Sequence, residues 1–130
     1  MRLKMSNLPK TWIIDLDGTV FLHNGYLLGK DILLPGVKNF FDNIPSSDKI
    51  ILITARNESF REFTERSLIG YGIRYDLLIM NLPVGERILI NDNKPKGLRT
   101  AYAVNLTRNK GLSDISISYL DNIYKDDFHE

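Results

Sequence analysis

The sequence predicts an α/β fold with a mainly parallel central sheet of about five strands between two helical layers. Short apolar runs alternate with helix-like stretches along the chain, and this alternation gives right-handed βαβ units. Polar clusters directly follow three of the apolar runs. The 130 residues are enough for one compact core. We therefore predict a single domain over residues 1–130.

Composition excludes several classes of protein. Hydrophobic residues make up 43% of the chain and charged residues 25%, as in ordinary soluble domains. The net charge of +1 does not indicate a broad electrostatic attraction to nucleic acid. The absence of cysteine excludes disulfides and thiolate sites, and no secretory signal or bilayer-length apolar run is present. We predict a cytoplasmic protein with neither nucleic acid nor membrane as a partner.

The first predicted strand follows a polar lead-in over residues 1–10 and ends in two acids. Asp15 and Asp17 are separated by one residue, so in a strand they share a face. Paired carboxylates at a strand end can bind Mg²⁺, or one can attack a substrate while the other moves a proton. A plain turn is the alternative, because Asp-Gly is a common turn pair.

A β-hairpin is predicted over residues 20–28. Asn24 and Gly25 lie between two apolar runs, which is a strong signal for a two-residue hairpin turn. The hairpin would stand beyond the acidic strand end, either as a flap over it or as a plain surface hairpin.

Two helices are predicted from apolar periodicity and from their end signals. Pro35 is a favoured first helical residue, and apolar residues then recur at positions 37, 40, 41 and 44. The second helix follows Asn57, which can cap it. It ends at Gly70 or Gly72.

Four further strands and a last helix complete the prediction. The second strand is followed by Thr54 and Arg56, and the fourth by Asn91 and Asp92. Ligand crevices in open α/β sheets lie outside such strand ends, so these clusters indicate one site. The predicted strands are 50–53, 77–80, 87–90 and 101–104, and a C-terminal helix and tail occupy 113–130.

Three segments resemble the motifs of haloacid-dehalogenase-like (HAD-like) phosphatases. Asp15-Leu16-Asp17-Gly18-Thr19 resembles the first motif, Ile51-Leu52-Ile53-Thr54 the second and Ile90-Asn91-Asp92 the fourth. The resemblance extends from residue 12 to 106 and is greatest to small members without a cap domain, which are associated with polysaccharide biosynthesis. It implies a Rossmann-like fold. It also implies a Mg²⁺-dependent phosphomonoester hydrolase that forms an aspartyl-phosphate on a phosphorylated sugar or related metabolite.

The resemblance also implies roles for individual residues. Asp15 would be the nucleophile, Asp17 the proton donor and later the base, and Thr54 a hydrogen-bond donor to the phosphoryl group. The Mg²⁺ site would comprise Asp15, Asp17, Asp92 and Asn91. The phosphate-binding residues would comprise Gly18, Thr19, Ala55, Arg56 and Lys96. Arg56 could equally pair with a carboxylate, because a guanidinium suits either acceptor.

The sequence departs from this family at the lysine of the third motif. Leu82 stands where that lysine is expected, and no lysine lies between Thr54 and Asp92. Since a phosphate site needs a fixed cation, Lys94 is the first candidate replacement, Lys96 the second and Arg87 the third.

Other hypotheses stay open beside the enzyme. Leu82, together with Asn91 in place of a second acid, motivates a catalytically degenerate binding or regulatory protein. A phosphoryl-accepting receiver-like switch is disfavoured, because a receiver places its reactive aspartate on a middle strand. With no room for a cap module between the motifs, the site would be open, and we predict a homo-oligomer.

Overall fold

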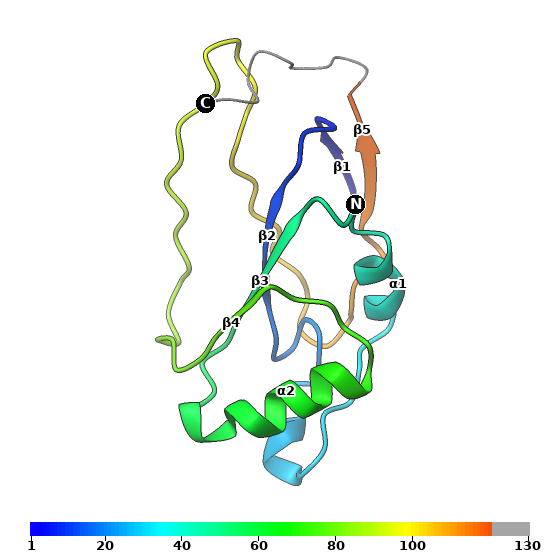
Figure 1. Cartoon of the computed structure of the whole chain (residues 1–130), viewed down its shortest axis with the longest axis vertical. Coiled ribbons are helices and arrows are strands. Elements are labelled where there is room, and N and C mark those ends of the chain that lie inside the picture. The colour runs from blue at the N-terminus through cyan, green and yellow to red at the C-terminus, as the bar shows by residue number, and fades with distance from the viewer. Residues whose placement is uncertain (121–130) are drawn as a thin grey trace.

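Parallel strand pairing organises residues 1–120, the part of the chain that the computed structural model describes (Figure 1). The architecture is α/β, as predicted, with a two-stranded and a three-stranded sheet. In chain order the elements are β1 (Arg2–Met5), β2 (Thr11–Asp15), the 3₁₀ helix η1 (Gly25–Leu28), α1 (Val37–Asp42), β3 (Lys49–Ile53), the 3₁₀ helix η2 (Glu58–Phe60), α2 (Arg61–Gly70), β4 (Leu77–Ile79) and β5 (Ser116–Tyr119).

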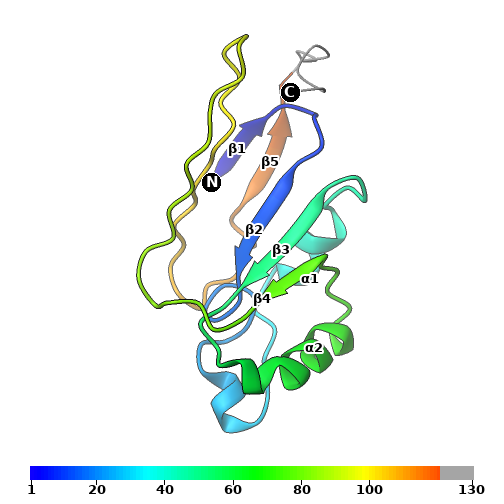
Figure 2. The same cartoon turned by 60° about the vertical axis from the view of Figure 1, so that its left-hand side comes forward.

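The three-stranded sheet has the order β2-β3-β4 and confirms three predicted strands. Asp15 pairs with Ile53, which in turn pairs with Ile79. The carboxyl ends of all three strands therefore lie at one edge, as the arrowheads in Figure 2 show. This parallel arrangement follows from the crossover connections, which contain α1 and α2.

The main core lies between this sheet and the two α-helices. Val37, Phe41 and Ile44 are buried, which confirms most of the predicted apolar face of the first helix. Leu68 of α2 and Leu52 of β3 are both fully buried in the same cluster. The strands therefore pack on a well-packed hydrophobic core, which fixes the position of their ends.

The second sheet corrects the predictions for both ends of the described chain. β1 lies within the expected polar lead-in and pairs in parallel with β5. The predicted helix over 113–130 is wrong at Ser116–Tyr119, where polar and non-polar residues alternate with the period of a strand. The rest of that predicted helix, from residue 121 onward, lies outside the described residues.

The predicted hairpin over 20–28 is also wrong. Asn24 takes a positive φ of 61° and precedes the 3₁₀ helix η1, so the turn residue is where it was expected but no second hairpin strand follows. Val20 and Phe21 are fully buried. Phe21 forms isolated bridges to Asp17 and Leu33. Packing of this run against the core outweighs the local hairpin signal.

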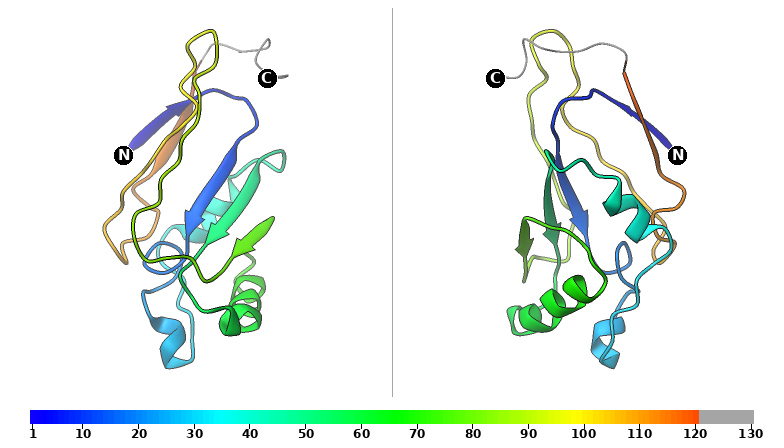
Figure 3. Two further views of the ribbon diagram at one scale, coloured as in Figure 1. Left: turned by 90° about the vertical axis from the view of Figure 1, so that its left-hand side faces the viewer. Right: turned by 45° about the vertical axis from the view of Figure 1, so that its right-hand side comes forward.

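The predicted strands at 87–90 and 101–104 do not form in the described structure. This segment runs away from the carboxyl ends of the strands and turns back where the Lys94 N–H donates to the Leu98 carbonyl (Figures 1 and 3). Ile88 and Ile90 are 82% and 90% exposed. The structure therefore does not show the predicted five-stranded sheet between two helical layers.

None of the helices within residues 1–120 has the length and apolar character needed to cross a lipid bilayer.

Candidate strand-tip site

Asp15, Asp17, Thr54 and Arg56 gather at the carboxyl ends of β2 and β3, and we call this group the strand-tip site. Asp15 ends β2, and Asp17 follows the fully buried Leu16. Asp17 lies beyond the end of β2, and its charge adds to the rise in the pKa of Asp15. That the two aspartates share a strand face stays a prediction from sequence.

Asp15 is the more accessible carboxylate of the pair. Its side chain is 32% exposed, and Arg87 Nη1 lies 3.2 Å from Asp15 Oδ1. The Thr19 hydroxyl donates to Asp15 Oδ2 at 3.3 Å. Burial raises the pKa of Asp15 above its usual 3.8, and the opposing effects of Arg87 and Thr19 only reduce this rise. Asp15 therefore keeps a proton to higher pH than a free aspartate.

Asp17 is fixed by donors from two sides. The Thr54 hydroxyl donates to Asp17 Oδ2 at 3.1 Å. Arg56 Nε lies 3.3 Å from Asp17 Oδ1 and 3.2 Å from Oδ2, and its Nη2 lies 3.0 Å from Oδ1. Both oxygens thus accept hydrogen bonds within the protein, and charge-assisted bonds of this kind hold a carboxylate in one orientation.

The Arg56 side chain is fully buried and also binds a second carboxylate, that of Asp31. Nη2 donates to Asp31 Oδ1 at 2.7 Å, and Nη1 donates to Oδ2 at 3.0 Å. Nη1 also donates to the Thr64 hydroxyl at 2.9 Å. All five N–H donors of the guanidinium are therefore used inside the protein. Of the two predicted roles for Arg56, this arrangement favours pairing with a carboxylate.

Aromatic rings and charge together explain how a buried guanidinium is tolerated. The guanidinium carbon lies 4.2 Å from the Tyr26 ring centre and 5.6 Å from that of Phe21. Desolvation lowers the pKa of Arg56, but its hydrogen bonds with Asp31 and Asp17 outweigh this and raise it. Arg56 thus stays charged and joins the two acids.

Asp31 and Thr64 were not among the residues predicted for the site. Neither residue belongs to a motif, and both lie far from Asp17 in sequence. The available signal was Arg56 itself. A charged residue directly after a buried strand needs acidic partners wherever the fold brings them.

Asp92 and Asn91 do not join the strand-tip site. They lie in the segment between β4 and β5 that runs away from the strand ends and returns (Figure 1), which we call the excursion. There Asn91 Nδ2 donates to Thr100 Oγ1 at 2.9 Å. The Thr100 hydroxyl also donates to the Asp92 carbonyl. The predicted convergence of Asp92 with Asp15 and Asp17 is wrong, because the strand that would carry it does not form.

A Mg²⁺ site needs oxygen ligands in octahedral geometry. Residues 1–120 contain no group of three or more acidic or histidine side chains placed to hold a metal. Both Asp17 oxygens already accept hydrogen bonds from Arg56 and Thr54. The residues as arranged do not fit the ion, so Mg²⁺ stays a prediction from sequence.

The cation that contacts the site is not the one ranked first from sequence as the replacement for the missing lysine. Arg87, the third choice, contacts Asp15. Lys94 and Lys96 instead lie in the distant turn of the excursion. Leu82, at the expected lysine position, donates its backbone N–H to the Thr54 carbonyl at 3.1 Å.

A loop far along the chain closes one side of the site. The Asn109 N–H donates to the Gly18 carbonyl at 2.9 Å, and Asn109 Oδ1 accepts from the His23 N–H at 2.9 Å. Gly18 has a φ of +85°, and a Cβ there would lie 3.0 Å from Arg108 Cγ. Glycine therefore allows both the turn and the close approach of Arg108. Ala55, by contrast, is exposed beside Thr54.

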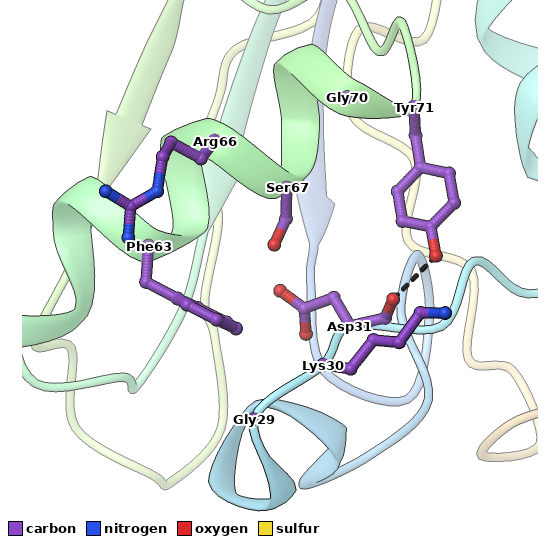
Figure 4. A pocket seen from close by; sticks show the side chains of 8 residues that line it. All are labelled: Gly29, Lys30, Asp31, Phe63, Arg66, Ser67, Gly70 and Tyr71. Atoms are coloured by element: carbon purple, nitrogen blue, oxygen red, sulfur yellow. Dashed lines mark hydrogen bonds between the residues drawn. The ribbon is translucent and has the colours of Figure 1, made fainter.

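A cavity of about 410 Å³ lies beside Asp31, and we call it the Asp31 cavity (Figure 4). The Tyr71 hydroxyl donates to the Asp31 carbonyl at 2.6 Å. The Asp31 carboxylate is fully buried and held by Arg56, so a single guanidinium connects the cavity wall to the strand-tip site. Its lining residues are Gly29, Lys30, Asp31, Phe63, Arg66, Ser67, Gly70 and Tyr71.

Comparison with known proteins gives solved structures only. No protein-family profile matches the chain, and no curated protein matches it. A chain in the structure of the Pnkp1/Rnl/Hen1 RNA repair complex is 36% identical over 64% of this chain, with a TM-score of 0.50. A chain in a structure of the Pnkp1/Rnl/Hen1 complex is 36% identical over 63%, with a TM-score of 0.49. The matches span 29% and 31% of those chains, respectively.

The match to a chain of an RNA repair complex contradicts the function that we predicted from the sequence. The identification with the HAD-like phosphatases is wrong, as are a sugar-phosphate substrate, a role in polysaccharide biosynthesis and the exclusion of nucleic acid. The structure supplies a reason: the fourth motif, at Asp92, does not meet the first at the strand ends. A low net charge also does not exclude RNA where the contact is local.

Proposed function

We propose that this chain acts in RNA repair or processing and receives a phosphorylated RNA end at the strand-tip site. The observation that carries this proposal is the 36% identity, over 64% of the chain, to a component of an RNA repair complex. The chain spans 29% of that component. The proposal therefore concerns the RNA-end contact and not the whole assembly.

The charges around the strand-tip site suit a terminal phosphate. Arg87 contacts the Asp15 carboxylate, and the Arg108 side chain packs against Gly18, the residue after Asp17. Guanidinium groups recognise phosphate oxygens through paired N–H donors.

The reaction that we propose is hydrolysis of the terminal phosphate monoester. Water attacks phosphorus, the bond between phosphorus and the ribose oxygen breaks, and inorganic phosphate leaves. The ribose oxygen takes a proton and becomes a hydroxyl. Asp15 is suited to give this proton because burial raises its pKa, and a proton lost by the attacking water restores it. Asp17, whose oxygens are both engaged, holds the geometry with Thr54.

RNA-end binding without turnover is the second candidate. Both Asp17 oxygens accept internal hydrogen bonds, and residues 1–120 offer no acidic trio for a metal. These features favour a site that holds a phosphate without cleaving its ester. The two candidates share the ligand and differ in product.

Matched RNA oligonucleotides test the proposal. We would compare 5′-phosphate, 3′-phosphate and hydroxyl ends on one sequence, with and without Mg²⁺, for binding and for phosphate release. Hydrolysis predicts release from one phosphorylated end and its loss in Asp15→Asn. Asp42→Asn, on an exposed carboxylate of α1, is the control. Binding without release supports the second candidate, and equal binding of all three ends contradicts both.

The larger sheet predicted from sequence also stays a proposal. Within residues 1–120, β2 pairs only with β3, and Ile13 of β2 is 50% exposed. The exposed apolar run at 88–90 has the composition of a strand. Its pairing beside β2 would extend the sheet toward the predicted five strands. A cytoplasmic location is likewise proposed.

A further inference from the structure

The Asp31 cavity combines rings, a hydroxyl and two cations. Figure 4 shows the Phe63 ring and the Ser67 hydroxyl turned toward Asp31 from α2. The Lys30 and Arg66 side chains lie on opposite sides of the cavity. Phe63 and Tyr71 are half-buried, whereas Lys30 and Arg66 are exposed. The cavity therefore has a partly apolar floor between two positive ends.

The accessible charge of this cavity is positive. The Asp31 carboxylate is fully buried and bound on both oxygens by Arg56, which it shares with Asp17, so its negative charge is buried and only partly offset. Arg66 has one exposed acidic neighbour, Glu62, at 3.2 Å. An exposed pair of this kind is weak and screened by water. Lys30 and Arg66 are therefore available to an anionic ligand.

These features match the requirements of a nucleotide in a single strand. Proteins bind such strands by stacking bases on aromatic rings and by placing cations along the phosphates. A volume of about 410 Å³ lies within the range of small-ligand sites. The cavity also shares Asp31 with the network that fixes Asp17.

We propose that the Asp31 cavity is a subsite for one nucleotide of the RNA strand whose phosphorylated end lies at the strand-tip site. The inference rests on the proposed function, because it needs RNA as the ligand. The base packs on the Phe63 ring, and the flanking phosphates meet Lys30 and Arg66. RNA thus contacts both ends of the Asp31–Arg56–Asp17 network.

The experiment measures fluorescence anisotropy of a dinucleotide and an octanucleotide that carry the same terminal phosphate. Both reach the strand-tip site, and only the longer RNA extends beyond it. The double variant Lys30→Gln/Arg66→Gln and the single variant Phe63→Leu remove the cations and the ring separately. Lys49→Gln is the matched control, because Lys49 is an exposed cation at the opposite, amino-terminal end of β3.

In the wild type we expect the octanucleotide to bind more tightly than the dinucleotide. Each cavity variant should weaken octanucleotide binding about fivefold or more, as loss of one stacked base does, and leave the dinucleotide unchanged. Octanucleotide binding unaffected by both variants, with the phosphorylated end still preferred, overturns the subsite alone. Loss of preference for a phosphorylated end overturns the proposed function. Tighter binding of a phosphate-free acidic peptide in the cavity also overturns the subsite.

Discussion

At the residue scale, one buried guanidinium determines the geometry of the strand-tip site. Arg56 lies between Asp17 and Asp31, and its side chain and that of Asp31 are fully buried. A buried ion pair adds little net stability, because desolvation offsets the attraction. Removal of one partner is costly, since it leaves a buried charge without compensation. Arg56 is therefore a sensitive position for both fold and site.

Arg56→Gln should destabilise the protein by about 3–5 kcal/mol, the usual cost of breaking a buried pair from one side. Urea unfolding measures this change. Arg66→Gln serves as the control, because Arg66 and Glu62 are 67% and 87% exposed. It should change the free energy of unfolding by less than about 1 kcal/mol. Similar losses in the two variants would contradict the structural role of Arg56.

Asp15→Asn should change the pH dependence of stability. Burial raises the pKa of Asp15 in the folded state above the ordinary 3.8, so the folded chain binds this proton more tightly than the unfolded chain. Wild-type stability from this group is therefore lost as pH rises from 3.8 to the raised pKa. The variant cannot ionise and should gain stability relative to wild type across that window. A constant or opposite difference in urea unfolding would contradict this sign.

The site residues next to the strands could be predicted from the sequence, but the residues that contact them could not. Asp15 ends β2 and Asp17 follows two residues later, and Thr54 follows directly from the end of β3. Asp31 and Arg87 reach these residues through tertiary contacts across long stretches of chain. No local period or motif encodes such contacts.

At the element scale, the segment after residue 110 packs closely against the chain just before α1. The Leu112 N–H donates to the Pro35 carbonyl at 2.9 Å, just before α1. Gly111 has a φ of +78°, and a Cβ there would overlap the Pro35 backbone. The approach of this segment to the first helix therefore requires glycine.

Gly111→Ala should destabilise the protein by more than about 2 kcal/mol, because a left-handed conformation alone costs an L-residue about 1–2 kcal/mol. Gly29→Ala separates the two causes, since Gly29 has a φ of +89° and an added Cβ would meet nothing within 4 Å. Gly29→Ala should lower the free energy of unfolding only by the cost of the left-handed backbone conformation. Gly85→Ala has neither problem, and thermal unfolding should show no loss. Equal stability of all three variants would contradict the close packing.

Elements were predictable where periodicity and burial agree. The apolar runs at β3 and β4 and the helical face of α1 formed as expected. The hairpin signal at Asn24 was overridden because Val20 and Phe21 are buried in the core. The apolar run at 88–90 stayed exposed. Strand formation depends on a neighbouring edge, which the local sequence does not specify.

At the scale of the whole molecule, the net charge of +1 limits the electrostatic contribution to RNA binding. The cations placed to meet phosphates are Lys30, Arg66, Arg87 and Arg108. With roughly 0.7 counterions released per contact on a single strand, the logarithm of affinity should fall with the logarithm of salt with a slope of about −3 or shallower. Anisotropy titrations over a range of KCl concentration measure it. A much steeper slope would indicate broad, non-local binding.

The most direct measurement follows backbone amides by ¹⁵N-resolved NMR during titration with two RNAs that differ only in a terminal phosphate. The amides of Gly18, Thr54 and Leu82 lie at the strand ends. Our account predicts that these signals shift with the phosphorylated RNA and change much less with the hydroxyl-ended one. Identical shifts with both RNAs, or shifts confined to other parts of the chain, would contradict the placement of an RNA end at the strand-tip site.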